Sequence, residues 1–174
     1  MAGFEIRPLA PADRGWVAQF VAERWGAETV VVHGETYRPQ QLPGFLALDQ
    51  GATAGLVTYH VAGESCEIVT LDSLRPNLGI GAALIEAVKT VACAAGCRRL
   101  WLITTNDNLA ALRFYQRRGF ELVAVHRRAV AAARRLKPEI PLVGAHGIPI
   151  RDEIELEMAL QAGCGAKLSA KPLA

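Results

Sequence analysis

This sequence of 174 residues lacks several features, and each absence excludes a class of protein. No uninterrupted apolar run approaches the roughly 20 residues that a helix needs to cross a bilayer. The first residues, MAGFEIRPLAPADR, do not have the basic and then apolar pattern of a secretory leader. The net charge of +2 is too small to favour binding to nucleic acid or to a membrane surface. We therefore expect a cytoplasmic protein with neither nucleic acid nor a membrane as a partner.

The four cysteines form no CxxC pair. Cys93 and Cys97 are one helical turn apart, but no second pair of His or Cys residues completes a zinc site. We expect Cys66, Cys93, Cys97 and Cys164 to be reduced and mainly structural, and we expect no metal site.

The composition is that of a compact globular domain, with 51% hydrophobic and 21% charged residues. At this length we expect one domain over residues 1–162, followed by a flexible tail over 163–174. Strands are predicted at residues 4–9, 29–34, 45–48, 54–61, 66–71, 98–105, 120–125 and 151–160. Helices are predicted at residues 11–25, 81–95, 108–118 and 126–136, and loops at 35–44 and 137–150.

The order of these elements predicts an α/β fold with a mixed sheet flanked by helices. Short turns join the three strands between residues 45 and 71, which is typical of an antiparallel meander. A helix separates the strands at 98–105 and 120–125, and a strand, helix, strand order predicts that these two are parallel neighbours.

Two glycines, Gly79 and Gly81, open the helix that begins near residue 81. The first turn of a helix has unpaired N–H groups and a partial positive charge, and glycine lets a phosphate approach the backbone. A Walker A loop is excluded because Ala82 and Ala83 stand where Lys and Ser or Thr are needed. A dinucleotide fingerprint is disfavoured by Leu84, which replaces a small residue. Alone, the two glycines are equally typical of a structural turn.

A second motif follows, in which Asn108, Ala111 and Tyr115 share one face of a helix. Together the two motifs resemble the GNAT superfamily of acyl-CoA-dependent N-acyltransferases. The family's loop pattern, Gln/Arg-x-x-Gly-x-Gly/Ala, is similar to residues 76–81. Its downstream pattern is similar to Asn108, Ala111, Phe114, Tyr115, Gly119 and Phe120. The resemblance implies a splayed sheet, acetyl-CoA as the co-substrate and transfer of an acetyl group to a primary amine.

The resemblance also implies a set of site residues. Tyr115 is expected to lie near the sulfur as the general acid, and the backbone of Leu71 and Ser73 to pair with the pantetheine arm. The full set expected to hold acetyl-CoA is Leu71, Ser73, Arg75, Asn77, Leu78, Gly79, Ile80, Gly81, Ala82, Asn108, Ala111 and Phe114.

The sequence departs from the family pattern at Pro76, where a polar side chain is usual and where proline offers no N–H. Arg75 stands one residue too early, so its part in phosphate binding is left open. The basic run from Arg113 to Lys137 indicates either a local anion site or a solvated helix face.

For the base that deprotonates the amine, Glu67 is the first candidate, because alternation places it on one strand face with Val69 and Leu71. An ordinary solvent-facing glutamate is the alternative, with Asp72 or a chain of waters as the base. We expect a small-molecule acceptor. A protein lysine or N-terminal acetyltransferase and a non-catalytic acyl-CoA sensor remain alternatives, and a homodimer is an expectation from the family.

Overall fold

The computed structural model describes residues 3–161 and Cys164, and it contains a seven-stranded sheet in the order β1-β4-β5-β6-β7-β9-β8. The strands of this sheet are β1 (Phe4–Pro8), β4 (Gly44–Asp49), β5 (Ala52–Ala62), β6 (Ser65–Ser73), β7 (Arg99–Thr105), β9 (Glu153–Ala159) and β8 (Glu121–His126). The helices are α1 (Arg14–Trp25), α2 (Ile80–Ala94), α3 (Leu109–Gln116) and α4 (Ala129–Leu136). A separate hairpin consists of β2 (Val30–Val32) and β3 (Glu35–Tyr37), and short 3-10 turns lie at Pro11–Asp13, Pro39–Gln41 and Ala145–Gly147.

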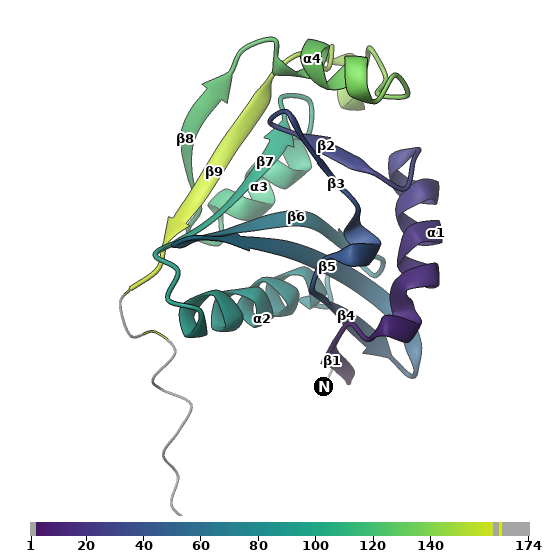
Figure 1. The fold of residues 1–174 in the computed structure, drawn as a ribbon, viewed down its shortest axis with the longest axis vertical. Coiled ribbons are helices and arrows are strands. Elements are labelled where there is room, and N and C mark those ends of the chain that lie inside the picture. Colours follow the sequence, from purple (N-terminus) through teal and green to yellow (C-terminus); the bar gives the residue numbers. More distant parts are fainter. Residues whose placement is uncertain (1–2, 162–163, 165–174) are drawn as a thin grey trace, which may run out of the picture.

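The helices cover both faces of the sheet (Figure 1). On one face α2 buries Leu84, Ile85 and Val88, whose spacing is the helical pattern in the sequence. On the other face α1 buries Val17 and Val21 against a second cluster. The mixed α/β sheet flanked by helices that the sequence predicts is therefore confirmed. Among the described residues, no helix is both long and apolar enough to cross a membrane.

The sheet divides between β6 and β7, which are parallel and pair over Ser65–Ile68 and Arg99–Leu102. Beyond these residues the two strands separate, and Figure 1 shows the resulting fork. One side of the fork is the meander β4-β5-β6, and the other is the group β7-β9-β8, which we call the wing.

A β-bulge in β6 lies where the fork opens. The pairing of β5 with β6 shifts register between Thr58 and Tyr59, so Val69 has no direct partner. Val69 packs in the α1 cluster, whereas Leu71, two residues later, packs against the α2 cluster. The bulge therefore reverses which face of the sheet the odd-numbered residues of β6 occupy.

Three predicted elements differ from the structure. β9 lies between β7 and β8 and is antiparallel to both, so the strands predicted as neighbours at 98–105 and 120–125 are parallel but do not pair with each other. The strand predicted at 29–34 is confirmed as β2, but the start of the loop predicted at 35–44 is a second strand, β3, which pairs with β2 in a hairpin. The last helix begins at Ala129 rather than 126, because β8 extends to His126 and pairs with Glu153.

The prediction of reduced cysteines is wrong for one pair, because a disulfide joins Cys93 near the end of α2 to Cys164. The end of β9 lies beside the turn after α2, where the N–H of Leu160 donates to the carbonyl of Arg98 at 2.8 Å. This tertiary contact brings together two cysteines that are 71 residues apart in the sequence. Cys66 and Cys97 are free and buried. Apart from Cys164, the tail predicted as flexible lies outside the described residues.

Candidate active site

An open cavity of about 520 Å³ lies at the fork and gathers most of the residues that the two motifs predict. Its lining consists of Leu71, Ser73, Arg75, Pro76, Asn77, Gly79, Ile80, Gly81, Ala110, Ala111, Phe114, Tyr115 and Arg118. Three predicted residues, Leu78, Ala82 and Asn108, do not line it. Pro76, Ala110 and Arg118 line it but were not among the predicted binding residues.

The end of β6 presents unpaired backbone to this cavity. The N–H of Leu74 donates to the carbonyl of Ala54 at 2.9 Å, which continues the antiparallel ladder between β5 and β6. In an antiparallel ladder, every second residue of a strand bonds to a given neighbouring strand. Leu74 and Asp72 therefore direct their N–H and C=O groups towards β5, and Leu71 and Ser73 direct theirs to the other side, towards the fork. An extended chain with amides of its own can therefore pair with them as an added strand.

The glycine loop leads into α2 without a capping side chain. Asn77 and Gly79 both have a positive φ, at 66° and 79°. Apart from its own neighbours in the chain, no atom of the described residues lies within 4 Å of the place where a Cβ on Gly79 would stand, so the approach to the first turn of α2 is open. Helix N–H groups without an acceptor and with open access are what an anion site requires.

Gly81 has a different role, because a Cβ there would lie 2.9 Å from Cζ of Phe114. The second glycine of the loop therefore makes room for an aromatic ring of α3. The guanidinium of Arg118 stacks on the same ring, and its Cζ lies 3.5 Å from the ring centroid. Arg118 belongs to the basic run that the sequence analysis noted, but spacing alone did not distinguish it from the other arginines there.

Arg75 lies at the edge of the cavity and forms an ion pair with Asp49 of β4. Asn108 caps α3, because its Oδ1 accepts from the N–H of Ala111 at 3.1 Å. The first residue of the downstream motif thus fixes the start of the helix that carries Tyr115.

Tyr115 is 8% exposed and packs edge-on against Phe114 and Phe120. Burial raises the pKa of its hydroxyl above the ordinary value, and the negative charge of Asp72 adds to this effect. The phenol therefore keeps its proton at neutral pH, as a proton donor must.

Glu67 lies on the opposite face of the sheet from Leu71, so the prediction that they share a face is wrong. The bulge at Val69 is the reason. Glu67 is 4% exposed, and its Oε2 accepts from the hydroxyl of Tyr37 at 2.8 Å. Burial raises the pKa of Glu67, the hydrogen bond from Tyr37 lowers it, and the net shift is upward. A buried carboxylate with a raised pKa is suited to accept a proton near neutral pH.

Asp72, the second candidate base, is engaged elsewhere. Its carboxylate accepts from Nε of Arg24 at 2.9 Å and from Nε1 of Trp25 at 3.3 Å, both from α1. Its oxygens therefore anchor α1 to the sheet, whereas the carboxylate of Glu67 is bonded only to the hydroxyl of Tyr37 among the described residues.

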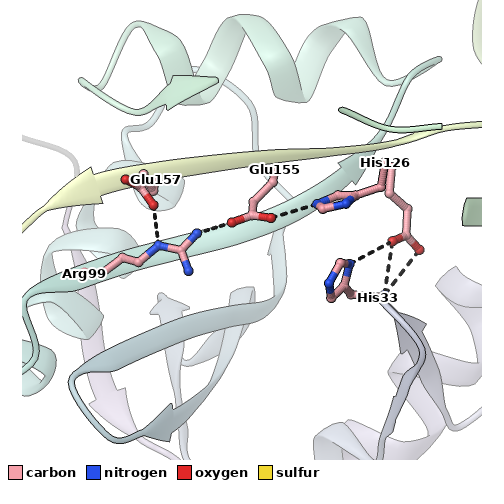
Figure 2. Close-up of polar contacts among 6 residues, drawn as sticks. His33, Arg99, His126, Glu155 and Glu157 are labelled. Atoms are coloured by element: carbon pink, nitrogen blue, oxygen red, sulfur yellow. Dashed lines mark hydrogen bonds and ion pairs between the residues drawn. The ribbon is translucent and has the colours of Figure 1, made fainter. Parts of the chain in front are cut away.

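On the Glu67 face of the sheet, the hairpin β2–β3 is tied to the wing, as Figure 2 shows. The N–H of His33, in the hairpin turn, donates to the buried carboxylate of Glu153 at 3.1 Å. The His33 ring packs against His126, with centroids 4.4 Å apart. These contacts join segments that are about a hundred residues apart, so the scattered histidines of the sequence gave no signal of them.

A further network lies along the wing itself (Figure 2). Nε2 of His126 lies 2.8 Å from Oε2 of Glu155, and Arg99 forms ion pairs with Glu155 and Glu157. Within residues 3–161 and Cys164, no group of three or more His, Cys, Asp or Glu side chains is arranged to hold a metal ion.

The chain is similar in sequence to a known family and to two proteins of one bacterium. A family model described as "Acetyltransferase (GNAT) family" matches residues 13–120. The chain is 47% identical over 150 residues to the uncharacterized protein YdhI of Bacillus subtilis (strain 168), covering 86% of this chain and 94% of that protein. It is 40% identical to YxbD of the same organism over 157 residues, covering 90% of this chain and 99% of that protein.

The chain also has the fold of solved acetyltransferase structures to which it is about 20% identical in sequence. The IAA acetyltransferase of Bacillus cereus has a TM-score of 0.70 at 20% identity, covering 91% of this chain and 100% of that one. A GNAT family acetyltransferase from Elizabethkingia anophelis, solved with acetyl-CoA bound, has a TM-score of 0.64 at 20% identity, covering 92% of this chain and 100% of that one.

Proposed function

The chain belongs to the GNAT acetyltransferase family, and on that premise we propose that it transfers an acetyl group from acetyl-CoA to the primary amine of a small molecule. One observation carries the proposal: the glycine loop, the unpaired end of β6 and Tyr115 all line one cavity at the fork. The continuous stretch over residues 71–81 thus meets the helix α3, which carries Tyr115 more than thirty residues later in the chain.

In this proposal the cavity holds the co-substrate. The backbone amides between Asn77 and Ala82, at the start of α2, would bind the pyrophosphate. Leu71 and Ser73 would pair with the amides of the pantetheine arm, as in a β-sheet. An N–H near Leu71 would stabilise the oxyanion that forms on the thioester carbonyl.

The reaction then needs one base and one acid. The neutral amine attacks the thioester carbon, so a C–N bond forms, and collapse of the tetrahedral intermediate breaks the C–S bond. Glu67 takes the proton that the amine loses, and Tyr115 gives its proton to the departing thiolate. The two residues occupy opposite faces of the sheet, which supports an acceptor that enters from the hairpin side.

The closed hairpin supports a small acceptor rather than a protein chain. Besides the contact from His33 to Glu153, the ammonium of the buried Lys137 donates to the carbonyl of Thr29 at 2.9 Å. The segment after α4 and the hairpin are thereby joined over the Glu67 face. An acceptor on a protein surface would need an open groove there.

The test is release of free CoA thiol from acetyl-CoA with a panel of small amines and of lysine and N-terminal peptides. We expect release only when an amine is present and faster turnover with small amines. Tyr115→Phe should lower kcat about a hundredfold or more, with the Kd for CoA unchanged. Tyr59→Phe is the matched control, because Tyr59 is equally buried but lies outside the cavity. CoA binding without turnover on any amine would favour a sensor and contradict the proposal.

A further inference from the structure

The cavity at the fork contains an arginine whose side chain is fixed before any ligand binds. We propose that Arg118, stacked on Phe114, is the cation that binds the pyrophosphate of acetyl-CoA and replaces the polar side chain absent at Pro76. This inference rests on the proposed function, since it assumes that the cavity receives acetyl-CoA.

Arg118 lies where a phosphate would meet the glycine loop. Its side chain lines the same cavity as Asn77 and Gly79, although it follows α3, about forty residues later in the chain. Pro76 lines this cavity too and has neither a side-chain donor nor an N–H. The guanidinium therefore stands opposite the loop whose own polar side chain is missing.

The side chain is held in place but its donors are not all used. Nη1 donates to the carbonyl of Phe114 at 2.8 Å, and the guanidinium lies over the Phe114 ring. Nε is fully buried and has no hydrogen-bond partner among the described residues. A buried donor without an acceptor is costly, and a guanidinium binds phosphate oxygens through two parallel N–H groups. Because solvent does not reach Nε, a bound pyrophosphate would be contacted by the outer N–H groups of the guanidinium.

Gly81 completes the arrangement. A Cβ at this position would displace the Phe114 ring, and with it the surface on which Arg118 lies. Gly81 and Phe114 are thus positioning residues for the cation, which gives the second glycine of the loop a purpose apart from backbone contact with phosphate.

Arg75 is the competing cation and is less suited to this task. Its guanidinium is paired with Asp49 and half exposed, so its charge is already offset and screened. Arg113 and Arg117 belong to the same basic run but are exposed and outside the cavity lining.

The experiment is calorimetric titration of CoA, dephospho-CoA and pantetheine into the wild type, Arg118→Gln and Arg117→Gln. We expect Arg118→Gln to weaken binding of CoA and of dephospho-CoA about tenfold or more, and to leave pantetheine unaffected. Arg117→Gln removes the same charge from the neighbouring residue and should bind all three as the wild type does. Arg118→Lys keeps the charge without the planar fork and should bind CoA with intermediate affinity.

Each contrary outcome has a distinct meaning. If the wild type binds no CoA, both the proposed function and this inference fail. If the wild type binds CoA and Arg118→Gln matches Arg117→Gln, only the inference fails. If Arg118→Gln weakens CoA but not dephospho-CoA, the cation binds the 3′-phosphate and the pyrophosphate assignment is overturned.

A double-mutant cycle tests the positioning. Phe114→Leu should weaken CoA binding in the wild type, and should add little further loss in the Arg118→Gln background. Losses that add fully, or an equal loss of pantetheine affinity, would show that Phe114 only shapes the cavity and would overturn its positioning role. Gly81→Ala should behave as Phe114→Leu does.

Discussion

The hydroxyl of Tyr37 donates to the carboxylate of Glu67, the candidate base. Burial raises the pKa of Glu67 and the bond from Tyr37 opposes that rise. Tyr37→Phe should therefore raise the pKa of Glu67 further. A base works when deprotonated, so the acidic limb of kcat/KM against pH should move to higher pH, by an amount on the order of one pH unit.

The measurement is kcat/KM between pH 5 and 9 for the wild type, Tyr37→Phe and the control Tyr59→Phe. The plateau at high pH should be nearly the same for all three, since Glu67 is ionised there in each. An acidic limb at the same pH in Tyr37→Phe and the wild type would mean that Glu67 is not the base.

Residue by residue, the sequence predicted what depends on local spacing. The resemblance to the GNAT pattern, in which Tyr115 stands seven residues after Asn108, pointed to Tyr115 as a site residue, and it does line the cavity. The face of Glu67 could not be predicted, because a single bulged residue, Val69, reverses the alternation and leaves no mark in the sequence. Arg118 could not be singled out either, since the tertiary contact that brings its partner Phe114 against Gly81 is not visible in the sequence.

At the scale of elements, the disulfide ties α2 to the segment after β9. It closes a loop with a sequence separation of 71 residues, and such a link reduces the conformational freedom of the unfolded chain. Cys164→Ser should lower the free energy of unfolding by about 2–4 kcal/mol.

Urea unfolding with and without dithiothreitol measures this effect. The reductant should bring the wild type to the stability of Cys164→Ser and should leave the variant unchanged. A wild type that is indifferent to the reductant would mean that Cys93 and Cys164 are not joined in solution.

Helices α2 and α3 were predicted to within a few residues, because their apolar residues recur at helical spacing and glycines follow them. The place of β9 was not predictable in this way. Its alternating pattern identifies a strand, but its insertion between β7 and β8 depends on pairings between residues that are 27 to 60 positions apart in the sequence. The first strand of the hairpin, β2, was predicted from its β-branched residues, but β3 was missed because its three residues are too few for a periodic pattern.

At the scale of the whole molecule, Glu155 holds the wing together. Burial raises the pKa of Glu155, but hydrogen bonds from His126 and Arg99 outweigh that effect and the net shift is downward. A carboxyl whose pKa is lowered on folding contributes stability above its unfolded pKa, and this contribution is lost as the pH falls through the folded value. Glu155→Gln should therefore destabilise the protein at pH 7, by about 1–3 kcal/mol.

The difference in the free energy of unfolding between Glu155→Gln and the wild type should become smaller below the ordinary glutamate pKa of 4.5, because the wild-type carboxyl also becomes protonated there. Urea unfolding at pH 7 and below pH 4 measures it. Glu86→Gln is the control, because Glu86 is exposed and its ion pair with Lys89 has little effect. A difference that does not change with pH would show that the charge of Glu155 is not what stabilises the wing.

The homodimer and the cytoplasmic location that we expected from the sequence stay predictions.

Pro76 has a consequence beyond the side chain that it lacks. Proline holds its own φ at about −65° and restricts the residue before it to extended conformations. The exposed loop between β6 and α2 therefore has fewer accessible conformations when no ligand is bound. Ordering a loop on binding costs conformational entropy, so a stiff loop loses less of it when a phosphate arrives. The polar contact that Pro76 cannot make is therefore partly offset by a smaller loss of conformational entropy when the loop binds a phosphate.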